Sequence, residues 1–247
     1  MTTLIFYENP VPLNREQHRA TRLKTLVHGY SYAARCNSVP LVVTEFAAAC
    51  REYPIVFTFD GSESGIPIVL VGLNNEENLF VAPDGTWQAN YIPAFVRRYP
   101  FVLYETSDDG DATVMIDEAY AGFGAPDGEL LFADDGTDAP LLTNVVEFLN
   151  HFKRDAHSTG IFMTRLRQLN LLVPRKVDVR MADDRMVTME GFHVVDEERL
   201  AALGDADLLA LARNGELALI HTHMLSLNSI ENLARRLSQR EISAKAT

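Results

Sequence analysis

WQANYIPAFVRRYPFVLY, at residues 87–104, is the stretch that says most about the fold of this chain. It holds six aromatic residues, two prolines and the adjacent pair Arg97 and Arg98. Pro93 and Pro100 limit a helix to the few residues between them, because proline lacks a backbone N–H and disfavours helical backbone in the residue before it. We therefore expect a short helix pinned at both ends, with buried rings and the arginines near its last turn.

The segments on either side of this stretch have the composition of β-strands. Apolar runs rich in valine, isoleucine and phenylalanine predict strands, and the Asp60-Gly61 and Asn74-Asn75 pairs between them predict turns. The runs are YPIVFTF (53–59), IPIVLVGL (66–73), NLFVAP (78–83), FVLYE (101–105), ATVMID (112–117) and GELLF (128–132). Upstream, Asn14 is expected to cap a helix through Leu23, Leu26 and Val27, and Pro40 to stand in the first turn of a second short helix, LVVTEFAAAC (41–50).

The second half of the chain is predicted to be mainly helical. Apolar residues recur at spacings of three and four from Pro140 to Leu172, and His157–Gly160 is expected to divide this region into two helices. A hairpin should follow across residues 182–184, and Asp196 and Asp205 should cap the next helices. The last helical segment, 216–237, places six apolar residues on one face: Leu217, Ile220, Met224, Leu227, Ile230 and Leu237.

These patterns predict an α+β fold. It is mainly an antiparallel sheet with helices packed against it and a helical C-terminal portion. We expect one domain at residues 1–240 and a flexible tail at 241–247.

Composition limits the classes of partner. The chain has 247 residues, is 47% hydrophobic and carries a formal net charge of −12. An acidic surface repels phosphate backbones and anionic lipids, so nucleic acid is not an expected partner. No run reaches the roughly 20 apolar residues that span a bilayer, which predicts no membrane insertion, and the first residues lack the features of a secretion signal. We therefore expect a cytoplasmic protein, with Cys36 and Cys50 as reduced, apolar residues.

Several polar groups are candidate sites. His221 and His223 suit a shared metal ion only on a strand, and the helical periodicity around them favours packing or hydrogen bonding, with His221 facing the apolar stripe. The acidic groups Asp108, Asp109, Asp111 and Asp134, Asp135, Asp138 lack the spacing of a calcium loop and are expected in solvated turns. His151, Asp155 and His157 form only a loose cluster. We predict no metal and no cofactor, and we assign no catalytic residue, because no nucleophile, phosphate-loop or zinc motif is present.

Arg97 and Arg98 are the most interesting polar pair. A guanidinium among aromatic rings can clamp a carboxylate or phosphate, or it can pair structurally with a carboxylate such as Glu45 or Glu105. The candidate ligand-binding residues are Trp87, Arg97, Arg98 and Tyr99.

The chain resembles a known family over most of its length, from about residue 10 to 237. The resemblance is carried by VPLVVTEFAAACREYPIVF (39–57), VGLNNEENLFVAPDGTW (71–87), YIPAFVRRYPF (91–101), GFHVVDEERLAAL (191–203) and the LARNG and IHTHMLSL segments within 211–227. This series is similar to the SapC family of bacterial S-layer-associated proteins, which is distinct from the peptide-transport permease of the same name. The resemblance implies a link to surface layers, or to TonB-dependent receptors and nutrient uptake, and it supplies no catalytic residue set.

Three functions follow as hypotheses. The favoured one is a cytoplasmic binding or accessory protein with a protein or peptide partner. The second is a metal-dependent oxidative enzyme, which requires at least three histidines to converge with a carboxylate, among His18, His28, His151, His157, His193, His221 and His223. The third is a structural component of a surface layer.

Overall fold

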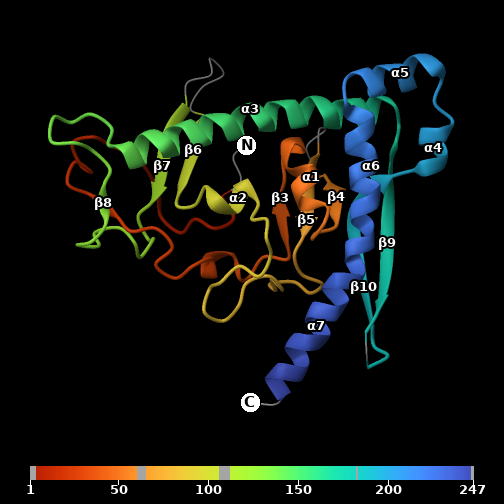
Figure 1. Cartoon of the computed structure of the whole chain (residues 1–247), viewed down its shortest axis with the longest axis horizontal. Coiled ribbons are helices and arrows are strands. Elements are labelled where there is room, and N and C mark those ends of the chain that lie inside the picture. The colour runs from red at the N-terminus through yellow and green to blue at the C-terminus, as the bar shows by residue number, and fades with distance from the viewer. Residues whose placement is uncertain (1–3, 60–64, 106–111, 182, 246–247) are drawn as a thin grey trace.

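The predicted β-runs assemble into antiparallel sheets. In the computed structural model, which describes residues 4–59, 65–105, 112–181 and 183–245, a five-stranded sheet has the order β3-β5-β4-β10-β9 (Figure 1). Its strands are β3 (Ser38–Pro40), β5 (Ile66–Leu70), β4 (Ile55–Thr58), β10 (Met186–Val195) and β9 (Leu172–Arg180). The long β9–β10 hairpin therefore adds to a sheet begun by the first third of the chain. The turn expected at Asp60-Gly61 lies outside the described residues.

A second, three-stranded sheet has the order β1-β7-β6. It is built from β1 (Pro10–Pro12), β7 (Ala112–Asp117) and β6 (Phe101–Glu105). Phe101 pairs with Ile116 and both are buried. A two-stranded piece joins β2 (Arg22–Leu23) to β8 (Glu129–Leu130), so the predicted GELLF strand is shorter than its apolar run. The predicted NLFVAP strand is absent from these sheets, and only Val81 bridges to Trp87 there.

One helix, α3 (Pro140–Gln168), crosses both sheets, and it is unbroken. The prediction of two helices divided at His157–Gly160 is therefore wrong. The hydroxyl groups of Ser158 and Thr159 bond back to the carbonyl oxygens of Arg154 and Asp155, one helical turn earlier, instead of capping a new helix. Thr159 also accepts a hydrogen bond from the Val43 N–H at 3.0 Å, and this tertiary contact outweighs the weak helix propensity of the segment.

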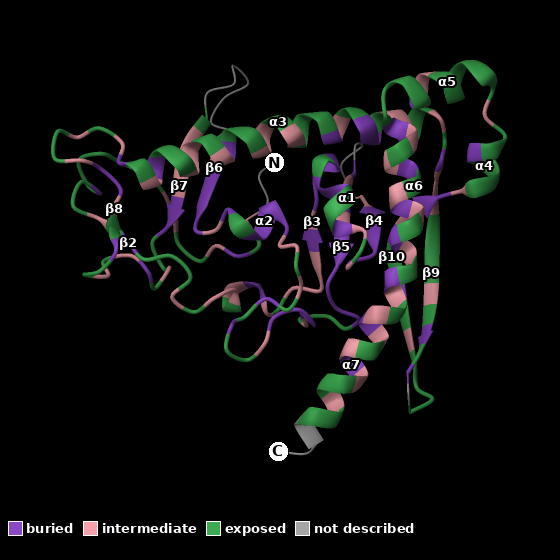
Figure 2. Ribbon diagram, viewed as in Figure 1, coloured by how far each residue is buried: buried purple, intermediate pink, exposed green. Residues whose placement is uncertain are grey.

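Two clusters of buried apolar side chains lie along α3. Leu142 and Leu149 join the smaller cluster with Phe101 and Ile116, beside the three-stranded sheet. Phe162, Met163 and Leu166 join the larger cluster, beside the five-stranded sheet. Figure 2 shows buried positions along the helix where it passes each sheet. The same helix thus completes both cores.

The predicted helix after Asn14 is wrong. Asn14 does cap a turn, because its Oδ1 atom accepts hydrogen bonds from the N–H groups of Glu16 and Gln17. The chain then enters β2, and Leu26 has a φ of 54°, which no right-handed helix allows. The second short helix is present but begins later than expected, because Pro40 lies in β3: it comprises η2 (Val43–Glu45) and α1 (Phe46–Ala49).

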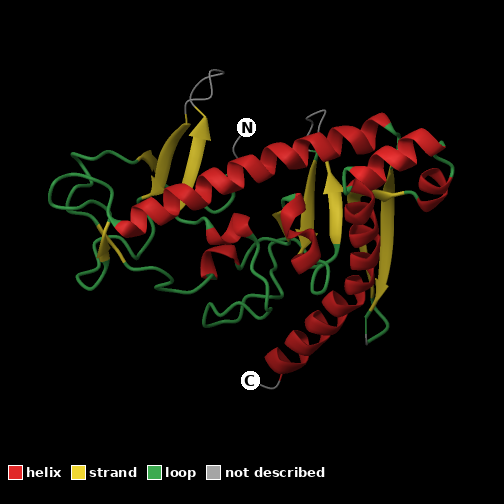
Figure 3. Ribbon diagram, turned by 45° about the horizontal axis from the view of Figure 1, so that its top comes forward, coloured by secondary structure: helices red, strands yellow, loops and turns green. Residues whose placement is uncertain are grey.

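The C-terminal portion is helical, as predicted. Its elements are α4 (Glu197–Ala201), α5 (Asp205–Arg213), α6 (Glu216–Ser226), η3 (Leu227–Ser229) and α7 (Ile230–Lys245). Outside this portion, a short 3₁₀ turn, η1 (Ser31–Ala33), lies near the N-terminus. Asp196 caps α4 through the N–H of Arg199, as predicted, whereas Gly204 and not Asp205 precedes α5. Figure 3 shows α6 against the face of the five-stranded sheet, where it contacts β10 and β4.

The α+β prediction is confirmed, with antiparallel sheets and packed helices. The division into one domain and a flexible tail at 241–247 stays a prediction. Among the described helices, none is both long enough and apolar enough to cross a membrane.

Candidate functional site

The aromatic and arginine segment forms the predicted short helix. α2 (Ala94–Arg97) is one turn long, with Pro93 as its N-cap, and the chain reaches Pro100 three residues after the helix ends. Trp87, Phe95 and Phe101 are buried, whereas Tyr104 is 43% exposed. The prediction of buried rings therefore holds for three of the six, and Tyr91 and Tyr99 are half-buried.

The adjacent arginines have opposite environments. Arg98 is only 6% exposed, and its guanidinium carbon lies 3.9 Å from the centroid of the Phe95 ring and 5.4 Å from that of Phe152. It also hydrogen-bonds the hydroxyl of Tyr7, while burial lowers the pKa of the guanidinium. Arg98 is therefore part of the interior.

Arg97 faces solvent. Its Nε atom donates to the carbonyl oxygen of Ile92 at 3.0 Å, and its guanidinium carbon lies 5.2 Å from the centroid of the Phe148 ring on α3. Phe148 is half-buried, as is Tyr91 nearby. An exposed cation thus stands over one half-buried ring and beside another.

A buried carboxylate fixes the approach to α2. Glu45 accepts hydrogen bonds from the Tyr91 hydroxyl at 2.6 Å, from the Ala94 N–H at 2.7 Å and from the Val42 N–H at 3.1 Å. Burial raises the pKa of Glu45, and these three donors act in the opposite direction. Glu45 therefore caps α2 and holds the Tyr91 side chain in place near Arg97.

Trp87 and Tyr99 are tied into a chain of ring contacts. Trp87 Nε1 donates to the Tyr53 hydroxyl at 2.8 Å, so the polar atom of this buried indole is already used. The Tyr99 ring stacks on Tyr32 at 4.2 Å, and its hydroxyl donates to Asp117 Oδ2 at 3.0 Å. Of the four predicted ligand-binding residues, Arg97 is exposed, Tyr99 half-buried, and Trp87 and Arg98 buried. Their role in binding stays a prediction.

The prediction that His221 faces the apolar stripe of α6 is wrong. His221 is exposed, and His223 is fully buried against the Phe57 ring. The six apolar residues predicted to share a face all lie in or against the larger cluster, and the buried face also includes polar residues that an apolar periodicity does not register. These are Glu216, His223, Ser226 and Ser229. His223 nevertheless has the structural hydrogen-bonding role predicted for this pair.

The other candidate groups lie apart. Within the described ranges, no three histidine, cysteine, aspartate or glutamate side chains are placed to hold one metal ion. Asp135 accepts from the Thr137 N–H in a turn, and Asp138 pairs with Arg15 at 2.7 Å. Asp108, Asp109 and Asp111 lie outside the described residues. Cys36 and Cys50 are free and half-buried, and burial raises the pKa of the Cys36 thiol to about 11.

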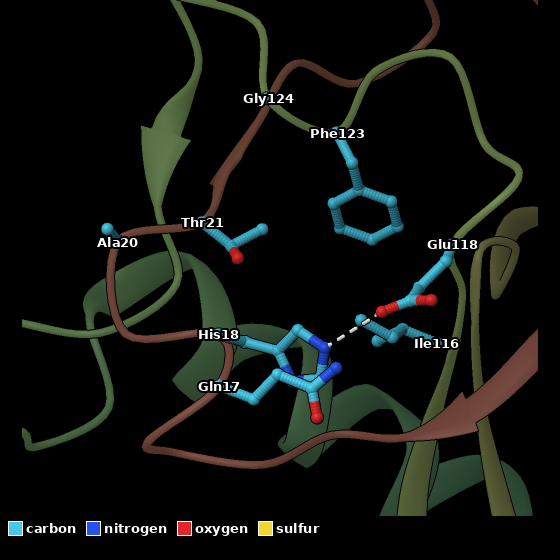
Figure 4. A pocket seen from close by; sticks show the side chains of 8 residues that line it. All are labelled: Gln17, His18, Ala20, Thr21, Ile116, Glu118, Phe123 and Gly124. Carbon is cyan, nitrogen blue, oxygen red and sulfur yellow. Dashed lines mark hydrogen bonds and ion pairs between the residues drawn. The ribbon is translucent and has the colours of Figure 1, made fainter.

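A pocket that the sequence did not indicate lies between the N-terminal turn and the end of β7. It has a volume of about 530 Å³, and Figure 4 shows the side chains that line it. The buried His18 lies with Nε2 3.2 Å from Glu118 Oε1. These two residues are 100 positions apart in the sequence, so their contact was not predicted. The one sequence feature that bears on this pocket is Asn14, whose N–H bonds to the His18 ring one turn later.

Comparison with known proteins gives one match. No curated protein and no solved structure matches the chain. The family model for SapC matches residues 13–233, which include α2, Glu45, the His18 pocket and the buried face of α6. The chain therefore belongs to the SapC family.

Proposed function

We propose that this protein is a binding or accessory protein whose partner is a protein or peptide, and that Arg97 is the centre of its binding surface. The observation that carries the proposal is the exposed Arg97 guanidinium held over the Phe148 ring. Arginine and aromatic residues are the usual anchors of protein interfaces.

The support of Arg97 favours binding over a purely structural role. Its Nε atom is fixed to the Ile92 carbonyl, and Glu45 fixes Tyr91 alongside. A guanidinium held in this way loses less conformational freedom when a partner binds than a mobile surface arginine does. With the Arg97 guanidinium and the rings of Phe148 and Tyr91 held in place, this surface suits a ligand that carries a planar anionic group beside an apolar group.

The partner chemistry that fits is a peptide carboxylate next to an aromatic side chain. The guanidinium can donate two parallel hydrogen bonds to a carboxylate, and the half-buried rings of Tyr91 and Phe148 offer apolar contact. The family's link to surface-layer and TonB-receptor systems makes an acidic, aromatic segment of such a protein the partner that we propose. We place this interaction in the cytoplasm, where the free thiols of Cys36 and Cys50 would stay reduced.

The test uses a fluorescent peptide, acetyl-Phe-Glu-Phe-Glu, and its neutral analogue acetyl-Phe-Gln-Phe-Gln-amide. Fluorescence polarisation should show saturable binding of the acidic peptide to the native chain. Arg97→Ala should weaken it about tenfold or more, because a charge-assisted hydrogen bond is lost.

Arg213→Ala is the matched control, since this exposed arginine ends α5 and lies in another element. It should leave binding unchanged while altering net charge equally. Equal affinity for the two peptides, or unchanged affinity in Arg97→Ala, would contradict the proposal. Fractionation of cells that express the protein checks the compartment.

A further inference from the structure

The pocket at His18 is separate from the Arg97 surface and has a different chemistry. Its volume of about 530 Å³ lies within the range of about 300–1,000 Å³ that is usual for small-molecule sites. Polar and aromatic side chains both line it. They are those of Gln17, His18, Thr21, Glu118 and Phe123.

Close backbone contacts hold the loop that carries Phe123, which lines the pocket. Gly122 lies so near to Lys24 that a Cβ atom would stand 2.1 Å from the Lys24 carbonyl oxygen. At Gly128 a Cβ atom would stand 2.7 Å from the carbonyl carbon of Leu23. Only glycine permits both approaches, and between them Phe123 forms a bridge with Leu23. The loop that carries Phe123 is thus held against β2.

The Phe123 ring is a fixed wall. It makes edge contacts with the rings of Phe101 at 6.2 Å and Tyr120 at 5.9 Å. Figure 4 shows the ring on the same side of the pocket as the Glu118 carboxylate, with Thr21 facing them. One aromatic face and one carboxylate therefore border the same space.

The hydrogen bonds of His18 place a proton on Nε2. The Glu118 carboxylate can only accept, so the Nε2 N–H points to Glu118 Oε1 at 3.2 Å, while Nδ1 lies 2.9 Å from the Asn14 nitrogen and 3.1 Å from the Asn14 carbonyl oxygen. Glu118 supplies the one carboxylate among the described residues that line the pocket, and its side chain keeps 37% of its surface exposed.

We infer that this pocket binds a small organic ammonium ion. The Glu118 carboxylate supplies the counter-charge, and the Phe123 ring supplies a cation–π and apolar contact. Gln17 and Thr21 supply further acceptors for the N–H groups. The His18 N–H orients the carboxylate, so that the acceptor is in place before the ligand arrives.

Benzylammonium and benzyl alcohol are the probes, because they share a shape and differ in charge. NMR spectra of protein labelled at histidine and phenylalanine should show saturable shifts of the His18 and Phe123 signals with benzylammonium. Glu118→Gln should weaken this binding about tenfold, since it removes the charge and keeps a polar group of the same size. Glu190→Gln, an exposed position on β10, removes the same charge elsewhere and should have no effect.

Three results would overturn the inference. They are equal affinity for benzyl alcohol and benzylammonium, affinity within about twofold of native in a folded Glu118→Gln, and no saturable shift up to about 10 mM benzylammonium. Melting temperatures of both variants establish that they are folded. The peptide assay at Arg97 is independent of all three results, because it reports on a different surface.

Discussion

The imidazole of His223 on α6 joins two strands of the five-stranded sheet. Its Nδ1 atom donates to the Ile55 carbonyl oxygen of β4 at 2.8 Å, and its Nε2 atom accepts from the Val195 N–H of β10 at 3.1 Å. Both ring nitrogens are used only when the ring is neutral, because a protonated ring has no acceptor. Burial lowers the pKa of His223 from 6.5 to about 4.

This pKa predicts an acid-labile contribution to stability. Between pH 6.5 and about pH 4, His223 is protonated in the unfolded chain and neutral in the folded chain. Because the unfolded state binds more protons in this range, the free energy of unfolding falls as the pH decreases through it. At about 1.4 kcal/mol per pH unit, the loss amounts to about 3 kcal/mol by pH 4. Urea unfolding at several pH values measures it.

His223→Gln and His221→Gln form a matched pair for this measurement. Glutamine at 223 keeps one donor and one acceptor but does not titrate, so the variant should lose less stability than the native chain between pH 7 and 4. His221 is exposed, and its variant should follow the native curve. Identical slopes for all three proteins would refute the assignment.

The two neighbouring arginines should respond very differently to removal. Arg98→Ala takes away a buried guanidinium that contacts two rings and the Tyr7 hydroxyl, and we expect a loss of about 2–4 kcal/mol in the free energy of unfolding. Arg97→Ala removes an exposed side chain and should cost about 1 kcal/mol or less. Chemical denaturation of both variants is the measurement, and similar losses would contradict the burial of Arg98.

Glu45 allows a graded test of its three hydrogen bonds. Glu45→Gln keeps an oxygen for the Tyr91 hydroxyl and the Ala94 N–H but turns an amide N–H towards the Val42 N–H, so we expect a loss of about 1–2 kcal/mol. Glu45→Ala leaves all three donors without this acceptor, and the loss should reach about 3 kcal/mol. The order of the two melting temperatures checks the argument, and Glu45→Ala melting at or above Glu45→Gln would be evidence against it.

Two glycines give opposite predictions. Gly160 lies inside α3 with no atom within 4 Å of an added Cβ, so Gly160→Ala should stabilise the protein by about 0.5–1 kcal/mol. Gly122→Ala would drive a methyl group into the Lys24 carbonyl oxygen and should destabilise it. Thermal unfolding compares them, and a destabilising Gly160→Ala would indicate that α3 is interrupted after all.

Local chemistry explains what could be predicted from the sequence. Proline fixes backbone geometry within one or two residues, so Pro93 and Pro100 bounded α2 correctly. Apolar runs separated by turn residues likewise predicted antiparallel strands. The same local rules failed at Ser158 and Thr159, because these hydroxyl groups found partners within α3 and on Val43.

The candidate sites depend on contacts between residues far apart in the sequence, and such contacts were harder to predict from the sequence than the helices and strands. His18 and Glu118 meet because β1, shortly before Asn14, pairs with β7, which ends one residue before Glu118. His223 is buried because its ring makes hydrogen bonds with backbone groups of two strands. Hydrophobic periodicity does not predict the burial of a polar side chain for this reason. Arg97 and Arg98 were recognised together, but their opposite environments depend on Phe148 and Phe152, one helical turn apart on α3.

The unbroken α3 makes the two apolar clusters mechanically dependent. A helix of 29 residues is about 43 Å long, and it behaves as a stiff rod over that length. Leu149 is embedded in one cluster and Phe162 in the other, so a tilt of the rod at the first displaces the second. Arg97 lies over Phe148, so it contacts α3 at the end of the helix that belongs to the smaller cluster.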